Sequence, residues 1–406
     1  MAVEKIRHIH VVVVGISGAG IGVSKALATL ARDEGYPNLQ VTMVDANPYY
    51  YHLLGAPRGL VDKEYAQRQF FRLDGLLASL EVDPTRPQHR FIHARLTNIE
   101  GGKVVELSTG ERLSFDYLVL ATGAQNAFPA NVRAGSIEEA RQRVAQLHED
   151  VARAKSILVI GGGAVGVEMA GEIAQEYKKK VTLVHSSSRL LPLNFKPGLS
   201  NGAVYKLRQL GVDVVLNERV EVPEALEFTG TLRPLVLKGK SGREYPSDLQ
   251  LLATGTKLRT EYMEGLELQL GNLREPNGAI KVRSTLQLDT DTLPTVFVVG
   301  DVNSLPQGAK YLVKAAEQSK LAAANISEMI RKGVDCNGGG EAKLQVWNGS
   351  LMNMIAVPIG RYMGVGQFVG LAFGKSRVGD YLLRMTKNKD YFLSKVAAEF
   401  PTDANS

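Results

Sequence analysis

The sequence predicts an α/β fold of two similar units, the second inserted in the first, followed by a small C-terminal α+β region. Three observations lead to this prediction. A strand, a glycine-rich turn and a helix follow one another twice; each copy has a later apolar strand that ends in Ala-Thr-Gly; and one late strand ends in Gly-Asp. Strands that alternate with helices in this way form parallel sheets covered by helices.

The first copy begins with the apolar run His10–Val14, which leads into the turn Gly15-Ile-Ser-Gly-Ala-Gly20. Residues 21–33 carry apolar side chains at helical spacing, and a second strand, Gln40–Asp45, follows. A strand, a turn and a helix in this order begin a βαβ unit.

The second copy repeats this order. It consists of the strand Ser156–Ile160, the turn Gly161–Gly166, a helix through about Tyr177 and the strand Lys180–His185. The later strands are Asp116–Gly123, Asp248–Gly255 and Thr295–Asp301. We therefore predict a first domain from residues 1–150 and 280–330, an inserted domain from 151–279, and a C-terminal domain from 341–406 after a linker at 337–340.

Composition narrows the classes of function. The chain has 406 residues, which is too long for one ordinary core, and its net charge of +6 suits anionic ligands or an anionic membrane surface. The chain contains no run of lysine and arginine with interleaved aromatic residues, so the sequence does not predict nucleic-acid binding. No apolar run approaches the roughly 18 residues that span a bilayer, and the first strand begins too early to leave room for a signal peptide. We expect a protein that is cytoplasmic or lies peripherally on a membrane.

Cysteine usage limits the redox chemistry. Cys336 is the single cysteine of the chain, so neither an internal disulfide nor a redox-active cysteine pair can form. The sequence predicts no metal site.

The glycine turns predict dinucleotide binding. A turn between strand and helix points free N–H groups at a pyrophosphate, and glycine allows the tight turn, the approach of phosphate and close helix packing. Gly161, Gly163 and Gly166 meet all three needs. The first copy has Ser17 at the second position, between Gly15 and Gly20 and beside Gly18 and Ala19. Because serine is small and can donate a hydrogen bond, we expect it to be tolerated.

The two second strands end differently. Asp45 can accept hydrogen bonds from ribose hydroxyls, whereas His185 and the following serines bring no carboxylate. A carboxylate there would repel a 2′-phosphate, and Arg189 could pair with one. We therefore predict that the second site accepts NADPH alongside NADH.

These motifs, in this order, resemble the pyridine nucleotide–disulfide oxidoreductase superfamily. Gly166–Ile173, Val181–Ser186 and Leu383–Phe392 resemble the ferroptosis-suppressor and apoptosis-inducing-factor-like family and, more distantly, type II NADH:quinone dehydrogenases. The resemblance implies two Rossmann-like domains, with FAD in the first and NADH or NADPH in the second. It also implies hydride transfer to the flavin and electron transfer to a quinone or another acceptor.

The resemblance also implies roles for single residues. It assigns Arg58, Leu96 and Asp301 to FAD, Glu168 to an acid near the nicotinamide, and Lys310 to a lysine near the flavin ring. Further cofactor-contact candidates from the Ala-Thr-Gly and Gly-Asp motifs are Thr122, Gly123, Gly255 and Gly300. Of the glutamines that type II dehydrogenases carry near the flavin, only Gln318 is present, so the quinone-site chemistry of those enzymes does not transfer directly.

Two questions stay open at this point. The protein could be an NAD(P)H:quinone oxidoreductase, or a redox-responsive interaction protein with slow NADH oxidation. The C-terminal apolar stripe Val378, Leu382, Met385, Phe392 and Val396, set among basic residues, predicts an amphipathic helix. That helix either rests on an anionic membrane, such as the mitochondrial outer membrane or a lipid droplet, or packs on the first domain. A homodimer is also compatible with the sequence.

Overall fold

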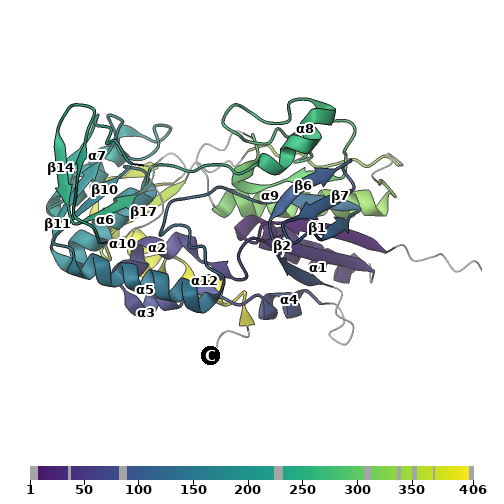
Figure 1. The fold of residues 1–406 in the computed structure, drawn as a ribbon, viewed down its shortest axis with the longest axis horizontal. Helices are drawn as coiled ribbons and strands as arrows, with labels where there is room; N and C mark the ends of the chain where they lie inside the picture. The colour runs from purple at the N-terminus through teal and green to yellow at the C-terminus, as the bar shows by residue number, and fades with distance from the viewer. Residues whose placement is uncertain are drawn as a thin grey trace, which may run out of the picture.

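The computed structural model describes residues 8–34, 38–81, 89–223, 232–305, 312–335, 340–349, 354–368 and 371–401. It contains two parallel sheets, which lie toward opposite ends of the long axis in Figure 1. The strand order is β16-β9-β1-β2-β5 in the first sheet and β12-β11-β10-β15 in the second. The predicted α/β class with two Rossmann-like units is therefore confirmed.

The first sheet is buried on both faces. Its strands are β1 (Ile9–Val14), β2 (Leu39–Asp45), β5 (Arg90–His93), β9 (Tyr117–Leu120) and β16 (Val296–Val298). Val11 and Val13 face the helices α1 (Gly18–Glu34) and α9 (Leu312–Arg331), whereas Val12 and Val14 face the meander β6 (Leu96–Glu100), β7 (Val104–Leu107) and β8 (Arg112–Ser114). Because both faces of β1 are covered, β1 is a continuous apolar run.

The second sheet is built in the same way. Its strands are β10 (Ser156–Ile160), β11 (Lys180–Val184), β12 (Asp213–Val215) and β15 (Leu249–Leu252). Val159 packs toward the side of α5 (Ile137–Arg153), α6 (Ala164–Tyr177) and α7 (Pro197–Gln209). Leu158 and Ile160 pack under the hairpin of β13 (Leu235–Lys238) and β14 (Glu244–Ser247).

Two connecting segments join the units and pair with each other at one bridge. The Gln125 and Lys257 backbones form an antiparallel bridge, with N···O distances of 2.8 and 2.9 Å. Beyond this bridge, η3 (Glu261–Met263) and α8 (Glu264–Leu270) return to the core of the first unit. We therefore place the return to the first unit at this bridge, ahead of the boundary that the sequence predicts at residue 279.

The chain between β2 and β5 reaches across to the second unit. Its elements are β3 (Tyr50–Tyr51), η1 (Leu53–Gly55), α2 (Ala56–Gly59), α3 (Lys63–Gln67), β4 (Phe70–Phe71) and α4 (Asp74–Leu80). Leu60 and Val61, just after α2, are buried in the core of the second unit. An excursion of the first unit thus becomes part of the packing of the second.

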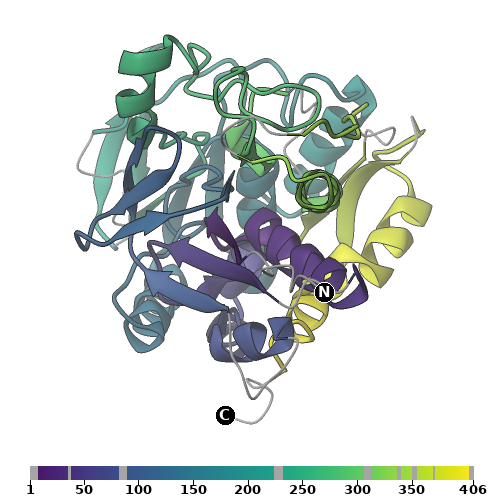
Figure 2. The ribbon, with the colours of Figure 1, turned by 90° about the vertical axis from the view of Figure 1, so that its right-hand side faces the viewer.

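The C-terminal region is an α+β unit, as predicted. It contains the antiparallel sheet β17 (Ile355–Ile359), β18 (Met363–Phe368) and β19 (Leu371–Phe373), followed by α10 (Arg377–Met385), α11 (Lys387–Asp390) and α12 (Leu393–Ala397). Val357 belongs to the core of the second unit, whereas Tyr391 and Phe400 belong to the core of the first. Figure 2 shows these elements, in yellow, along one side of the molecule beside α1.

The predicted C-terminal amphipathic helix is interrupted. Val378, Leu382 and Met385 are exposed on α10, but Val396 packs against the first core. Tyr391 and Phe392 have φ values of 50° and 64°, and this left-handed backbone ends the helical path between α11 and α12. Among the described residues, none of the helices combines the length and apolar character required to cross a bilayer.

Candidate functional site

The first glycine turn lies at the carboxyl end of β1 and packs directly on the first Ala-Thr-Gly strand. Gly15 has a φ of +101°, and a Cβ added there would lie 2.3 Å from the Ala121 carbonyl oxygen. A Cβ at Gly20 would lie 1.8 Å from the Gly15 carbonyl oxygen. Both positions therefore require glycine. Ser17 precedes α1, whose first residues are Gly18 and Ala19, so N–H groups of the first helical turn are available to an anion.

Two more of the predicted FAD residues, Asp45 and Gly300, lie beside this turn. Asp45 ends β2, where its Oδ2 accepts a hydrogen bond from the Ile16 N–H at 2.6 Å. Burial raises the pKa of Asp45, and the N–H groups of Ile16 and Asn47 oppose that shift. Gly300 has a φ of +78°, and a Cβ there would lie 3.1 Å from the Cβ of Ala19.

The adjacent motifs complete this end of the first sheet. The Thr122 hydroxyl hydrogen-bonds the Tyr262 hydroxyl at 2.8 Å, and Gly123 beside it has a φ of +61°. Leu96 is buried at the start of β6. Asp301 directly follows Gly300. The structure thus gathers the turn, Asp45, the Ala-Thr-Gly strand and the Gly-Asp turn. Which of these residues contact FAD stays a prediction.

The second glycine turn has nearly the same geometry. Gly161 has a φ of +113°, and its added Cβ would lie 2.2 Å from the Ala253 carbonyl oxygen. The added Cβ of Gly166 would lie 1.8 Å from the Gly161 carbonyl oxygen. In contrast, a Cβ at Gly163 meets no atom within 4 Å, and Gly255, with a φ of +94°, also faces open space. Gly163 therefore leaves room beside the start of α6, where a phosphate group can approach.

His185 occupies the position in the second unit that Asp45 occupies in the first. Its Nδ1 accepts a hydrogen bond from the Gly162 N–H at 3.0 Å, just as Asp45 accepts one from Ile16. Burial lowers the pKa of His185, and because Nδ1 accepts a hydrogen bond, the neutral ring carries its proton on Nε2. Arg189 lies in the loop that follows, and its Nη2 donates to the Leu193 carbonyl oxygen at 3.3 Å.

A buried ion pair joins the two units. Arg58, on α2, donates from Nε and Nη2 to the two carboxylate oxygens of Glu172, on α6, both at 2.9 Å. Burial alone would lower the pKa of Arg58, but the hydrogen bonds and the charge of Glu172 raise it. Both side chains are almost fully buried, at 3% and 1% exposure. The flavin contact of Arg58 stays a prediction, and the observed partners of its guanidinium lie on α6 and at the Asn388 carbonyl oxygen.

The C-terminal unit adds two residues to this pair. Lys387 donates to Glu168 Oε1 at 2.6 Å, and the Tyr391 hydroxyl donates to Glu172 Oε1 at 3.1 Å. We call Arg58, Glu168, Glu172, Lys387 and Tyr391 the buried charge cluster. Burial raises the pKa of Glu168, and the neighbouring Lys387 opposes that shift.

The sequence did not mark Lys387 or Tyr391 as site residues. Both lie in the stretch Leu383–Phe392 that supports the family resemblance, and that resemblance was the available signal. Nothing in their local pattern indicates that they are buried beside α6.

The helix after the Gly-Asp turn brings two polar side chains inside. Gln318 is fully buried, and its Oε1 accepts from the Gly300 N–H at 2.8 Å and from Asn303 Nδ2 at 3.0 Å. Lys314 is 9% exposed, and burial lowers its pKa. Gln318 thus fixes the turn that carries Asp301. Lys310, the predicted lysine near the flavin, lies outside the described residues.

The buried charge cluster borders a buried histidine, His52. His52 is 1% exposed, its Nε2 lies 2.8 Å from the Tyr391 carbonyl oxygen, and burial lowers its pKa from 6.5 to about 4. As pH falls below 6.5, the His52 ring therefore becomes protonated in the unfolded chain before it does in the folded chain. We expect the neutral ring to stabilise the fold above pH 6.5, and this contribution of about 3 kcal/mol to disappear as pH falls toward 4.

The measurement is the free energy of unfolding of the wild type and of His52→Gln between pH 7.5 and 4.5. Glutamine keeps an N–H donor but does not titrate, so the wild type should lose about 2–3 kcal/mol more than the variant across this range. Parallel pH profiles would show that His52 does not contribute to acid sensitivity.

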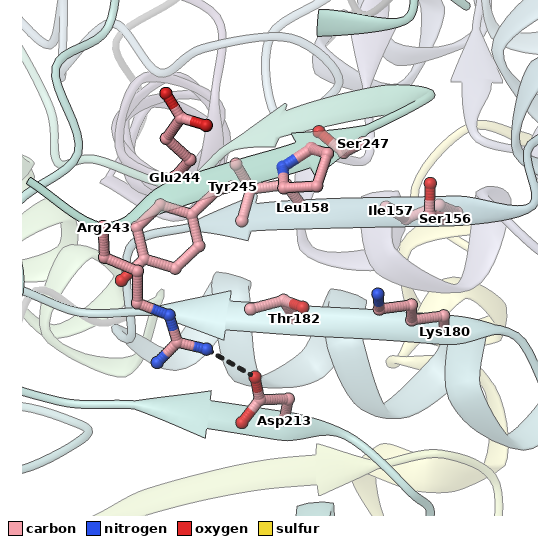
Figure 3. Close-up of a pocket in the computed structure, with 11 residues that line it drawn as sticks. Ser156, Ile157, Leu158, Lys180, Thr182, Asp213, Arg243, Glu244, Tyr245 and Ser247 are labelled. Atoms are coloured by element: carbon pink, nitrogen blue, oxygen red, sulfur yellow. Dashed lines mark hydrogen bonds and ion pairs between the residues drawn. The ribbon is translucent and has the colours of Figure 1, made fainter. Parts of the chain in front are cut away.

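A cavity of about 110 Å³ lies elsewhere, between the hairpin and the amino-terminal ends of the strands of the second sheet (Figure 3). Ser156, Lys180 and Asp213, the first residues of β10, β11 and β12, line it, and Arg243 pairs with Asp213 at 3.4 Å. The glycine turn and His185 lie at the opposite, carboxyl ends of these strands. This cavity is therefore separate from the candidate dinucleotide site.

Comparisons with known proteins show to which family the fold belongs. The family model of pyridine nucleotide-disulphide oxidoreductases matches residues 9–323. Human ferroptosis suppressor protein 1 is 29% identical over 389 residues, which cover 95% of this chain and 94% of that protein. Apoptosis-inducing factor homolog A of Dictyostelium discoideum is 25% identical, with 95% and 91% covered.

Solved structures show the same fold. The sulfide:quinone oxidoreductase of Aquifex aeolicus aligns with a TM-score of 0.66 and 20% identity, over 96% of this chain and 92% of that one. The water-forming NADH oxidase of Lactobacillus brevis, bound to NADH, aligns with a TM-score of 0.61 and 19% identity, over 89% and 75%.

Both glycine turns fit a dinucleotide, because each combines N–H groups at the start of a helix with positions where only glycine fits. FAD and NAD(P)H are the cofactors of this group of proteins. The chain is an oxidoreductase, and it belongs to the pyridine nucleotide-disulphide oxidoreductase family.

Proposed function

We propose that the protein oxidises NADH or NADPH and passes the electrons directly from its flavin to a quinone. One observation carries this proposal: the chain contains two dinucleotide-binding units but a single cysteine, so it has no redox-active cysteine pair between flavin and acceptor. A quinone acceptor is supported by the likeness to the ferroptosis suppressor and to the sulfide:quinone oxidoreductase.

Each of the two units would bind one nucleotide. In the first unit, Gly15–Gly20, Asp45 and the turn held by Gln318 would bind and orient FAD. In the second, the turn Gly161–Gly166 would hold the pyrophosphate of the nicotinamide nucleotide. When bound, the flavin accepts a hydride from the nicotinamide and gives electrons to the acceptor. The protein's task is to hold both nucleotides in register and to control the charge around them.

Glu168 would act where α6 meets the C-terminal unit. It lies two residues after Gly166, is 2% exposed and pairs with Lys387 at 2.6 Å. Burial favours the protonated form of this carboxyl, and the charge of Lys387 favours the ionised form, so both forms are accessible to an acid at this position. We assign Glu168 the part of an acid near the nicotinamide, and Lys387 the part of the residue that positions it.

An acceptor panel tests the proposed reaction. Loss of NADH is followed with a ubiquinone analogue, menadione, ferricyanide and oxygen, using the FAD-loaded protein. We expect rapid turnover with quinones and slow turnover with oxygen. A long-lived charge-transfer complex together with slow turnover on every acceptor would instead favour a redox-responsive interaction protein.

The second site should accept both nicotinamide nucleotides. His185 stands where an acid would repel the 2′-phosphate, and its neutral ring can donate from Nε2. Steady-state kinetics should give kcat/KM values for NADH and NADPH within about a hundredfold of each other. In His185→Asp, the carboxylate should reduce kcat/KM for NADPH far more than for NADH. A wild-type preference for NADH beyond about a hundredfold contradicts this assignment.

A membrane surface would bring the enzyme to a lipid-soluble quinone. On α10, exposure is 62% for Val378, 61% for Tyr381, 40% for Leu382 and 64% for Met385. These side chains recur at helical spacing on one face, whereas Leu383 is buried beneath the helix. The exposed cations nearby are Lys375, Arg377, Arg384 and Lys389. An apolar face bordered by cations suits a bilayer with anionic lipids.

Co-sedimentation with vesicles that contain phosphatidylserine measures this contact. The double variant Val378→Asp/Met385→Asp should bind at least about tenfold more weakly than the wild type, because it places two carboxylates on the apolar face. Leu268→Asp is the matched control, since Leu268 is 90% exposed on α8. Equal binding by all three proteins would rule out α10 as the docking face.

A further inference from the structure

The helix α10 presents its apolar side to the solvent. Four of its large apolar side chains are 40–64% exposed: Val378, Tyr381, Leu382 and Met385. Its buried residues are Gly379 and Leu383. An amphipathic helix on the surface of a folded protein normally turns its apolar side to the core. Burial of apolar area alone would therefore favour the opposite orientation of α10, since four large apolar side chains lie outside and one lies inside.

An ion pair with α7 holds α10 in the observed orientation. Lys206, on α7, is 2% exposed, and its Nζ donates to Asp380 Oδ1, on α10, at 2.5 Å. The same Nζ donates to the Gly364 carbonyl oxygen at 2.6 Å, and the Gly364 N–H donates to Asp380 Oδ1 at 2.9 Å. These bonds form a closed network that joins α7, β18 and α10. Figure 1 shows α7 and α10 at the same end of the molecule.

Close packing surrounds the Lys206–Asp380 pair. A Cβ added at Gly364 would lie 2.6 Å from Leu383 Cδ1, and one added at Gly379 would lie 2.7 Å from Phe373 Cβ. Glycine at these two positions lets α10 approach β18 and β19 closely. The side chains of the pair are 2% and 20% exposed, so water screens their attraction only weakly. The pair is therefore able to oppose the tendency of the apolar side to turn inward.

The pair also removes a carboxylate from the outer side of α10. Between residues 375 and 389, Asp380 is the single acidic residue, and it points inward to Lys206. The exposed charged side chains of this segment are all cations: Lys375, Arg377, Arg384 and Lys389. The outer side of α10 thus combines apolar side chains with positive charge, which complements a bilayer with anionic lipids.

A tyrosine and a cation meet at each end of the helix. Lys375 Nζ lies 4.9 Å from the centre of the Tyr205 ring, before α10 begins, and the Arg384 guanidinium lies 5.3 Å from the centre of the Tyr362 ring, near its end. Tyr205 and Tyr362 are 45% and 58% exposed. Side chains with an apolar body and a polar end are suited to the boundary between lipid head groups and acyl chains. These two pairs therefore favour a bilayer as the partner of the apolar side.

We propose that Lys206, through Asp380, sets the rotation of α10 so that its apolar side faces a bilayer with anionic lipids. Neither residue belongs to the apolar side, so both are positioning residues for membrane contact. Without the pair, Asp380 would turn toward water and the apolar side would turn toward β18. The inference rests on the membrane contact proposed above, and it adds the residues that determine which side of α10 is available to the membrane.

Co-sedimentation of the FAD-loaded protein with vesicles of phosphatidylcholine and phosphatidylserine tests this role. Lys206→Leu should bind at least about tenfold more weakly than the wild type, although every residue on the apolar side is unchanged. Asp380→Asn, which keeps the shape of the side chain, should weaken binding in the same direction. Lys320→Leu is the matched control, because it removes an exposed lysine from α9 in the first unit and should change binding by less than about twofold.

Oxidation of Met385 by hydrogen peroxide measures the rotation of α10 without vesicles. Met385 is 64% exposed, so it should oxidise readily in the wild type. In Lys206→Leu, the rate should fall at least about threefold, because the rotated helix turns this side chain inward. Mass spectrometry of the peptide that contains Met385 gives the rate.

Four outcomes separate the possibilities. Vesicle binding by Lys206→Leu within about twofold of the wild type would overturn the proposal. So would fast amide hydrogen exchange throughout residues 377–385 in this variant, because the pair would then keep the helix folded instead of selecting its exposed side. A wild type that does not bind vesicles would refute the membrane contact itself, while the oxidation rate of Met385 would still test the effect of the pair on rotation. If the wild type forms a dimer that Val378→Asp/Met385→Asp dissociates, a second copy covers the apolar side and the bilayer assignment is wrong.

Discussion

Replacement of Glu172 by alanine is expected to lower the free energy of unfolding by about 3–5 kcal/mol. The change leaves the guanidinium of Arg58, whose side chain is 3% exposed, without its carboxylate, and the Tyr391 hydroxyl without its acceptor. A buried charge without a partner is among the most destabilising changes that one substitution can cause. Urea unfolding of the FAD-loaded protein at a fixed FAD concentration measures the loss.

Glu176 provides the matched control on the same helix. Its carboxylate lies 3.8 Å from Arg361, and both side chains are partly exposed, at 42% and 36%. Exposed pairs of this kind contribute about 0–1 kcal/mol, so Glu176→Ala should be nearly silent. If Glu172→Ala and Glu176→Ala destabilise the protein equally, burial of the Arg58–Glu172 pair has no special effect on stability.

The second large effect is expected from Gly163→Ala. A methyl group at this position meets no protein atom within 4 Å, and the φ of −69° is open to alanine, so the fold should tolerate the change. The methyl group would fill the space that the pyrophosphate of NAD(P)H needs beside α6. We expect kcat/KM for NADH to fall at least about tenfold, with an unchanged Tm and an unchanged FAD content.

Substitutions at two other glycines serve as controls for Gly163→Ala. Gly198→Ala also points into open space but lies at the start of α7, so it should leave both kinetics and Tm unchanged. Gly166→Ala should lower the Tm, because its Cβ would press on the Gly161 carbonyl oxygen. A wild-type kcat/KM in Gly163→Ala would show that the nucleotide does not approach this turn.

The features that sequence predicted best are the local ones. The glycine turns, their strands and the Ala-Thr-Gly repeats each depend on a few consecutive residues, because tight turns and close helix packing restrict which side chains fit. The structure shows the reason in both copies, where Gly20 and Gly166 occupy the same crowded position. The correspondence between His185 and Asp45 also follows from aligning the two copies.

The buried charge cluster could not be predicted in this way. Arg58 and Glu172 are 114 residues apart, and Lys387 and Glu168 are 219 residues apart. Isolated from their partners, such residues look like ordinary surface charges of amphipathic helices. Since the sequence does not show which polar residues are buried, the C-terminal apolar pattern also looked continuous. In the structure, Lys387 and Asn388 are buried and a left-handed turn follows them. Only the folded chain shows which charges share one interior.

The attachment of the second unit at several places has a mechanical consequence. If the paired segments at Gln125 and Lys257 were the sole attachment, they would act as a hinge about which the inserted unit could swing. The Arg58–Glu172 pair restrains the inserted unit as well. The C-terminal unit adds a further restraint, because it contributes to both cores and its Lys387 and Tyr391 bond to α6. A swing would have to break these buried bonds in every catalytic cycle. The distance that a hydride must travel is therefore expected to be set by a rigid frame, with nucleotides entering and leaving by diffusion and without domain closure.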